Sequence, residues 1–286
     1  KDFIDGVVMG EGEKIFLEIA QNFKKKSIYN IKGLTTKRNI ENITIIDNLK
    51  ELPSPYLEKI FNINKYHIFG FQTHRGCLYN CKYCQWSFPG KIRYYPIQQL
   101  IKELEFLSNL SNLYILQCID ADFLANKKYS FKIIEKMIKQ NIKFRQINLE
   151  MNYYNFDVEI SRVMRKMGDT ILVSFGLESS SEKVLNAVNK KIDLDLFKKQ
   201  VKKTKEQGFL VQINLLLGLP YQNWDTVNDT IAYVKKLKPD RIVVNPVCLE
   251  GKEKLGGFKD DFSKLSTFEL LEIQQKVIEM IKSGYS

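Results

Sequence analysis

Residues 75–84 read Arg-Gly-Cys-Leu-Tyr-Asn-Cys-Lys-Tyr-Cys, and they directly follow an apolar segment, His67 to Thr73. Three thiols with the spacing Cys-x3-Cys-x2-Cys can ligate three irons of a cuboidal cluster and leave the fourth iron open to a small molecule. We therefore predict that Cys77, Cys81 and Cys84 bind a 4Fe-4S cluster, with a substrate or cofactor at the open iron.

A zinc site is the main alternative for these thiols. Structural zinc uses four closed ligands in paired short spacings, and neither His67 nor His74 provides a fourth ligand in such a pattern. The chain has five cysteines, and three within eight residues suit a metal site in a reducing compartment better than a disulfide framework. We favour the cluster over zinc and expect no disulfides.

On either side of this loop, apolar strand-like segments alternate with amphipathic helical segments about every 30 residues, which is typical of successive β/α units around a parallel sheet. The expected strands are His67 to Thr73, Leu113 to Ile119, Ile142 to Leu149, Thr170 to Leu177, Phe209 to Leu217 and Arg241 to Val247. The expected helices are Ile97 to Leu107, Phe131 to Gln140, Val158 to Met167, Leu194 to Gln207, Trp224 to Leu237 and Thr267 to Ile281. The pattern predicts an α/β fold, a partial (β/α)6 TIM-like barrel.

The first 52 residues follow a different pattern. An expected strand, Gly6 to Met9, leads through a glycine-rich turn into an expected helix, Lys14 to Phe23, and Pro53-Ser54-Pro55 is typical of a linker. One strand and one helix cannot bury a core of their own. We therefore divide the chain into residues 1–52, the C-terminal remnant of a doubly wound, Rossmann-like domain plus linker, and residues 53–286, the barrel.

The Cys-x3-Cys-x-aromatic-Cys loop after the first of six β/α units resembles the radical S-adenosylmethionine (SAM) superfamily, over about residues 66 to 250. The resemblance implies that SAM chelates the open iron, and that the reduced cluster cleaves SAM to a 5'-deoxyadenosyl radical. It further implies a reducing electron donor of the flavodoxin or ferredoxin type. It does not identify the substrate, because members share the core and vary the cavity.

Two segments resemble positions that lie near SAM in this superfamily. Tyr83 matches the aromatic residue that packs near the adenine. Gln117 and Asp120 occupy the place of a Gly-Gly-Glu segment that contacts the SAM amino group, and Asp120 with Phe123 resembles the Asp-x-x-Phe of cobalamin-binding members. We expect Asp120 to offer its carboxylate to the SAM ammonium group, with a helix N-cap as the alternative role.

Two further segments extend the resemblance. Ser174 to Ser179 resembles a Gly-x-Glu-Ser segment whose serine and glutamate lie near the SAM carboxylate and ribose, so Ser174 and Glu178 are cofactor-binding candidates, with helix capping as the alternative for Glu178 or Ser179. Gly218 begins a Gly-Leu-Pro turn similar to one near the adenine. Gln212 and Asn214 share one face of the preceding strand and complete this set.

Polar residues also alternate on the third expected strand, at Gln146, Asn148 and Glu150. Polar side chains that face a barrel interior usually line a ligand cavity, so Glu150 is a candidate for the substrate side. Cys118 and Cys248 are expected to be buried apolar thiols, with a radical relay through Cys248 as the alternative.

Residues 5–13 resemble the last strand, turn and helix of the cobalamin-binding domain that precedes some radical SAM cores. Cobalamin would imply methyl transfer or rearrangement in a full-length protein. The Asp-x-His-x-x-Gly motif that ligates cobalt does not occur in these 286 residues. We therefore do not expect this chain to bind cobalamin by itself.

Composition limits the other function classes. The net charge is +11, but 37 of the 44 basic residues are lysines, which favours solvated helix faces over a nucleic-acid surface. A tRNA-modifying, methylthiotransferase-like protein and a non-catalytic iron–sulfur or zinc module remain the rival interpretations. No apolar run reaches membrane-spanning length, and no basic-then-apolar leader precedes the first element, so we expect a cytoplasmic protein.

Overall fold

The computed structural model describes residues 4–23, 30–37, 39–84, 86, 91–247 and 265–283. The chain divides into two compact units, Lys1–Ser54 and Pro55–Ser286. Each unit is described separately. The interpretation of the first unit as the remnant of a cobalamin-binding domain stays a prediction.

The first unit has a small core of its own. Strand β1 (Gly6–Val8) pairs antiparallel with β2 (Leu34–Thr36), and helix α1 (Glu13–Asn22) follows β1. The buried side chains of this unit include Ile15, Ile31 and Leu34, which form one cluster. A β-carbon at Gly10, where φ is +93°, would lie 2.2 Å from the carbonyl oxygen of Thr44, so the turn between β1 and α1 requires glycine.

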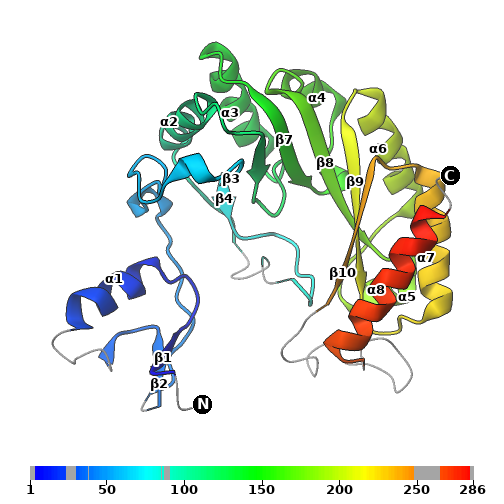
Figure 1. Ribbon diagram of the computed structural model, residues 1–286, viewed down its shortest axis with the longest axis horizontal. Helices are drawn as coiled ribbons and strands as arrows, with labels where there is room; N and C mark the ends of the chain where they lie inside the picture. Colours follow the sequence, from blue (N-terminus) through cyan, green and yellow to red (C-terminus); the bar gives the residue numbers. More distant parts are fainter. Residues whose placement is uncertain are drawn as a thin grey trace. The chain divides into compact units, whose positions relative to one another are not determined.

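The second unit is built on a six-stranded sheet, which is strongly curled (Figure 1). Its strands, in sheet order, are β10 (Arg241–Pro246), β9 (Leu210–Leu217), β8 (Gly168–Glu178), β7 (Phe144–Met151), β6 (Ile115–Cys118) and β3 (Ile68–Phe71). Every neighbouring pair is parallel. The predicted partial (β/α)6 barrel is therefore confirmed.

Helices cover the convex face of this sheet (Figure 1). They are α2 (Ile97–Ser108), α3 (Lys127–Lys139), α4 (Val158–Met164), α6 (Leu194–Glu206) and α7 (Trp224–Leu237), and α8 (Thr267–Lys282) packs beside the edge strand β10. Their apolar faces join the outward side chains of the strands, such as Leu116, Ile147 and Val173, in one fully buried core. This leaves the concave face for polar side chains and ligands.

The ends of several helices follow from local sequence. Asn126 accepts a hydrogen bond from the Tyr129 amide at the start of α3, Asp157 caps α4, and Asn223 forms a capping box with Thr226 at α7. Several short elements were not predicted: they include β2 of the first unit and, in the second unit, the hairpin of β4 (His74–Arg75) with β5 (Arg93–Tyr94) and the short helix α5 (Glu182–Ala187).

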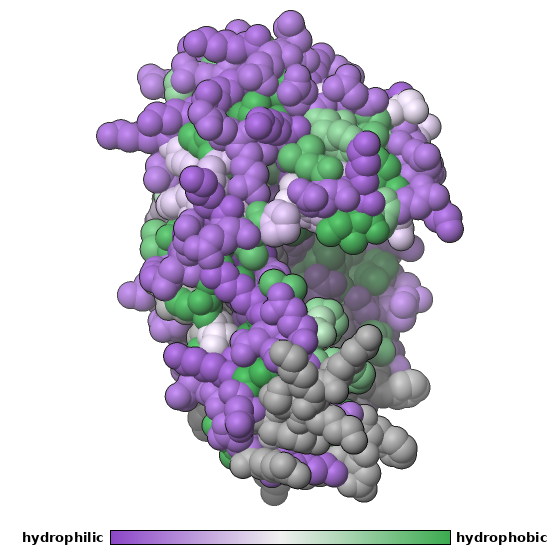
Figure 2. All heavy atoms as spheres, turned by 90° about the vertical axis from the view of Figure 1, so that its left-hand side faces the viewer, coloured by the Kyte–Doolittle hydropathy of each residue, from purple (hydrophilic) through white to green (hydrophobic). Residues whose placement is uncertain are grey.

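The surface agrees with the lysine-rich composition. Hydrophilic side chains predominate on the face shown in Figure 2, and apolar side chains show between them. Among the described residues, no helix combines the length and the apolar character that a membrane crossing requires. Cys248 lies outside the described residues, so the prediction for that thiol stays a prediction.

Candidate active site

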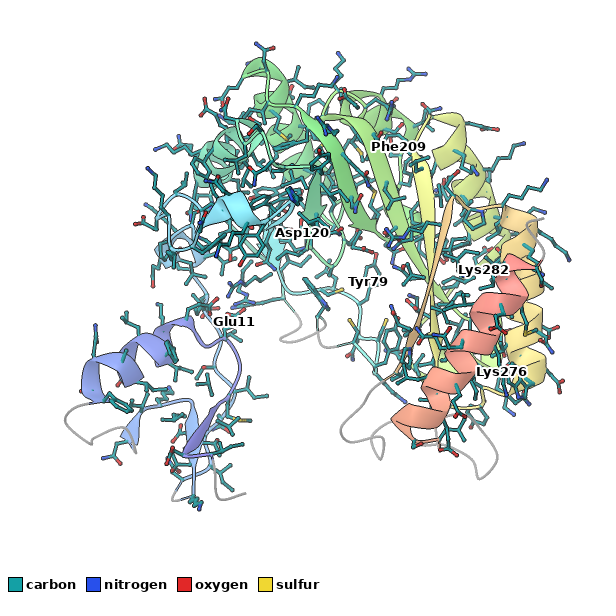
Figure 3. All side chains as sticks on the ribbon, in the orientation of Figure 1. Glu11, Tyr79, Asp120, Phe209, Lys276 and Lys282 are labelled. Carbon is teal, nitrogen blue, oxygen red and sulfur yellow. The ribbon has the colours of Figure 1, made fainter. Side chains whose placement is uncertain are left out.

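The cysteine loop leaves β4 and runs along the concave side of the sheet (Figure 3). Gly76, with φ at +92°, makes the turn into the loop, and a β-carbon there would lie 2.1 Å from the carbonyl oxygen of Lys91. Cys77, Cys81 and Cys84 follow as half-buried thiols. The Cys84 amide donates to the Cys81 carbonyl oxygen at 3.0 Å, so the second half of the loop is a tight turn.

A cavity of about 900 Å³ lies at the carboxyl ends of the strands, where β/α barrels place their active sites. Eight of the eleven predicted site residues line it: Cys77, Cys81, Cys84, Tyr83, Gln117, Asp120, Glu178 and Asn214. Ser174, Gln212 and Gly218 do not line it. This volume is large enough for a cofactor together with a substrate.

The three thiols lie in a partly buried environment. Burial raises the pKa of both Cys77 and Cys81, so their thiolate forms need a compensating positive charge. Among the described residues, no three His, Cys, Asp or Glu side chains surround a single metal position. In a cuboidal cluster, by contrast, each of the three thiolates binds a different iron. Three thiols on one loop, all of which line a large cavity, fit such a cluster.

A buried polar triad joins the loop to the sheet. The Lys190 ammonium group lies 2.9 Å from Glu178 Oε1 and 3.2 Å from the Tyr83 hydroxyl, which itself donates to Glu178 Oε1 at 3.2 Å. Burial, followed by the Glu178 charge, raises the pKa of Tyr83, so the phenol stays protonated and acts as a donor. Lys190 is a functional residue to which sequence reasoning assigned no role.

The spacing Gly176-x-Glu178 has a direct structural reason. The β8–β9 register shifts between these two positions, and Glu178 has a φ of +66°, which folds its side chain back over Gly176. A β-carbon at Gly176 would lie 2.4 Å from Glu178 Oε1 and 2.9 Å from Lys190 Nζ. Glycine at 176 therefore makes room for the ion pair, and Glu178 does not cap a helix.

Two hydrogen bonds tie the cysteine loop to the segment after α5. The Lys82 amide donates to the Val188 carbonyl oxygen at 2.9 Å, and the Asn189 side-chain amide donates to the Asn80 carbonyl oxygen at 2.8 Å. Asn189 has a φ of +56°, a conformation that asparagine tolerates better than most residues. The Asn189-Lys190 pair thus holds the loop and its aromatic residue against the sheet.

Ser179 does not cap a helix either, because the N-cap of α5 is Ser181. The Ser179 hydroxyl accepts a hydrogen bond from the Ser181 amide and lies 3.3 Å from the Thr230 hydroxyl oxygen, and Ser179 is fully buried. Gly218 ends β9 with a φ of +94°, and a β-carbon there would lie 2.8 Å from Leu270 Cδ1. The glycine therefore allows α8 to approach the end of β9 closely.

Amide side chains form a ladder on the concave face. Gln146 donates to Asn148 at 2.8 Å, and Asn148 donates to Gln117 at 2.9 Å. On the next strands Gln212 donates to Asn214 at 2.8 Å, and the Asn214 amide lies 3.5 Å from Glu150 Oε2. Burial, followed by the Glu178 charge, raises the pKa of Glu150. Glu150 lines the cavity as predicted.

Ser174 and Gln212 are buried and do not line the cavity. Glu150 pairs with Ser174, and Ser174 pairs with Gln212, so these three lie in one row across the sheet. Asn214 lies one row closer to the carboxyl ends, opposite Gly176. Ser174 therefore lies beside Glu150, and Gln212 lies below Asn214, to which its side-chain amide donates.

One buried thiol, Cys118, and one buried carboxylate, Asp120, complete the wall. Cys118 is fully buried, as predicted, and burial raises its pKa well above the usual value. Asp120 lies at the carboxyl end of β6 (Figure 3) and does not cap a helix, because α3 begins at Lys127 and Asn126 is its N-cap.

A curled parallel β/α half-barrel with a three-cysteine loop after its first strand defines a class of SAM-dependent iron–sulfur proteins. The family model of the radical SAM superfamily matches residues 71–234. The chain belongs to this superfamily. It is therefore a radical SAM enzyme whose cofactors are a 4Fe-4S cluster and SAM, and such enzymes need a reductant.

Two of the relatives of this chain are methyltransferases. An uncharacterized methyltransferase of Pyrococcus horikoshii is 28% identical over 83% of this chain and 54% of its own length. The cobalamin-dependent radical SAM methyltransferase TokK of Streptomyces tokunonensis is 23% identical over 80% of this chain and 37% of its own. The chain spans about half or less of the length of these relatives.

A solved structure supports the fold. The radical SAM methyltransferase TsrM from Kitasatospora setae, with cobalamin and a 4Fe-4S cluster bound, superposes with a TM-score of 0.68 and 15% identity. The match covers 85% of this chain and 51% of the TsrM chain. At this identity the likeness establishes the shared fold alone.

Proposed function

We propose that Cys77, Cys81 and Cys84 hold the 4Fe-4S cluster and that SAM binds in the adjoining cavity. The observation that carries the proposal is that the three thiols of the loop, Tyr83 and Glu178 line one cavity at the carboxyl ends of the strands. When bound, a reduced cluster supplies the electron that cleaves SAM to methionine and a 5'-deoxyadenosyl radical.

The residues of this chain position SAM and exclude water. Tyr83 offers its ring to the adenine, and its hydroxyl stays tied to Glu178. Glu178 and Lys190 present opposite charges at the cavity wall, beside the expected positions of the SAM ribose and carboxylate. Gln117 and Asn214 add amide groups at the floor. Fixed polar groups of this kind orient a bound cofactor without reorganising when it reacts.

For the full-length protein we propose radical-dependent methyl transfer, because the relatives named above are methyltransferases. The electron donor we propose is of the flavodoxin or ferredoxin type. A compartment that keeps these thiols reduced, such as the cytoplasm, suits them. The tRNA-modifying and zinc-module interpretations are not favoured.

The test is anaerobic reconstitution of the chain, followed by iron analysis, visible spectroscopy and a 5'-deoxyadenosine assay with dithionite. Wild-type protein should bind about four irons and form 5'-deoxyadenosine. Cys81→Ala should lose both the visible charge-transfer absorption and SAM cleavage. Cys118→Ala, which removes a thiol outside the loop, should keep the absorption. SAM cleavage by Cys81→Ala would refute the assignment.

A further inference from the structure

The Asp120 carboxylate accepts hydrogen bonds from two neighbouring residues of the protein. Asp120 Oδ1 accepts hydrogen bonds from the Thr73 amide at 2.7 Å and the His74 amide at 3.2 Å, and Oδ2 accepts from the Thr73 hydroxyl at 2.6 Å. His74 Nδ1 lies 3.5 Å from the same Oδ2. A carboxylate has about four lone-pair sites, so most of its acceptor capacity is already taken.

The carboxylate is also out of reach of the main cavity. The Asp120 side chain is 0% exposed, although the residue contributes to the cavity wall. Thr73 is equally buried and lines none of the described cavities. A SAM ammonium group in the cavity would therefore meet other atoms of residue 120 and not its charged oxygens.

The three residues stand at the start of the cysteine loop. Thr73 and His74 connect β3 to the turn at Gly76, and Cys77 follows immediately. The Thr73 carbonyl oxygen accepts from the Tyr95 amide at 3.0 Å, beside the β4–β5 hairpin. His74 lines a second, smaller cavity of about 130 Å³ together with Gly76 and Cys77. Its Nε2 has no hydrogen-bond partner among the described residues.

We propose that Asp120 is a positioning residue that fixes Thr73 and His74, and through them the place of Cys77, and that it does not contact SAM. This proposal rests on the proposed function of the cysteine loop. β3 and β6 are parallel neighbours, so the end of β6 brings the Asp120 acceptor directly beside the backbone donors that follow β3. The Asp120 carboxylate thus links the ends of the first two strands of the barrel, and Cys77, the first proposed cluster ligand, follows three residues after His74.

The test compares Thr73→Val with Asp120→Asn. Valine keeps the shape of threonine and removes only the hydroxyl donor, so the Asp120 carboxylate keeps its charge in this variant. The first readout is the alkylation rate of Cys77 in the cluster-free full chain, followed by mass spectrometry. Both variants should be alkylated roughly fivefold faster than wild type, since each loses part of one buried hydrogen-bond set. The double variant should add little, because the two side chains act as one unit.

Two further readouts use the reconstituted protein. The electron paramagnetic resonance spectrum of the reduced cluster should change in both variants, and SAM affinity should change equally in both. Asp157→Asn, which alters an exposed helix cap on α4, is the matched control and should behave as wild type in all three measurements. Circular dichroism verifies that each variant is folded.

Two results would overturn the proposal. One is wild-type alkylation of Cys77 in both variants. The other is a SAM affinity that falls roughly tenfold or more in Asp120→Asn alone, the size expected for a lost charge-assisted hydrogen bond to the ammonium group. A failure of the proposed function would be seen in a different measurement: the wild-type protein would form no 5'-deoxyadenosine with dithionite. The alkylation rates of the variants could still be compared in that case.

Discussion

Replacing Lys190 with methionine removes the only described cation of the Tyr83–Glu178–Lys190 triad and keeps most of the side-chain volume. The Lys190 and Glu178 side chains are 17% and 9% exposed, so the variant leaves a mostly buried carboxylate with one phenolic donor. Hydrogen bonds to charged groups contribute about 1.5–3 kcal/mol. Breaking a fully buried ion pair costs about 3–5 kcal/mol. Since water reaches part of Lys190, we expect a loss of about 2 kcal/mol.

Thermal and guanidinium unfolding measure this loss. A change of about 2 kcal/mol should lower Tm by roughly 4–8 °C for a protein of this size. Lys191→Met is the matched control, because Lys191 is the exposed neighbour and its loss should stay within about 0.5 kcal/mol. Glu178→Gln and the double variant complete a cycle that isolates the pair energy. Equal stabilities of the Lys190 and Lys191 variants would show that the triad does not stabilise the site.

Two other perturbations test the loop and its surroundings. Gly76→Ala should abolish retention of the cluster, because its β-carbon would clash with the Lys91 carbonyl oxygen. Gly70→Ala is the control and should retain iron, because its β-carbon would make only ordinary contacts. Iron analysis of both variants tests this prediction. Burial raises the pKa of Asp122 to about 6, from 3.8. Between these two pH values the folded chain therefore binds a proton that the unfolded chain has released. The unfolding free energy should fall by up to about 3 kcal/mol as pH rises from about 4 to about 6. Asp122→Asn should remove that part of the pH dependence in guanidinium unfolding, and an unchanged slope would contradict the assignment.

The strands and helices of the second unit could be predicted because each carries its own periodic signal. A continuous apolar run such as Ile171 to Leu177 is typical of a strand that is buried on both faces, and the structure has β8 there. Apolar residues at helical spacing, as in Trp224–Leu237, are typical of a helix that is buried on one face, and the structure has α7 there. The β4–β5 hairpin pairs only two residues per strand, and α5 has six residues. Neither is long enough to show a period, so both depend on tertiary contacts that a local pattern does not contain.

The candidate site was predictable as a set of positions, and less so as a set of interactions. Parallel strands bring their carboxyl ends to one edge, which is why residues from four different segments meet in one cavity. Which donor reaches which acceptor depends on details that spacing does not encode. Glu178 meets Lys190 because its positive φ and the small Gly176 fold the carboxylate toward the chain returning from α5. Asp120 meets Thr73 because neighbouring strands end at the same level.

The same reasoning indicates where family patterns are least informative. A carboxylate at the end of the second strand matches a position that contacts SAM in other members, yet here buried amide and hydroxyl groups take up its oxygens. Unpaired buried donors are costly, so Thr73 and His74 hold the carboxylate more firmly than a ligand that comes and goes. Besides Asp120, the residues that line the cavity include two carboxylates, Glu150 and Glu178. Glu178 is paired with Lys190, whereas Glu150 has no described cation beside it. We therefore expect Glu150 to be the carboxylate most open to the SAM ammonium group.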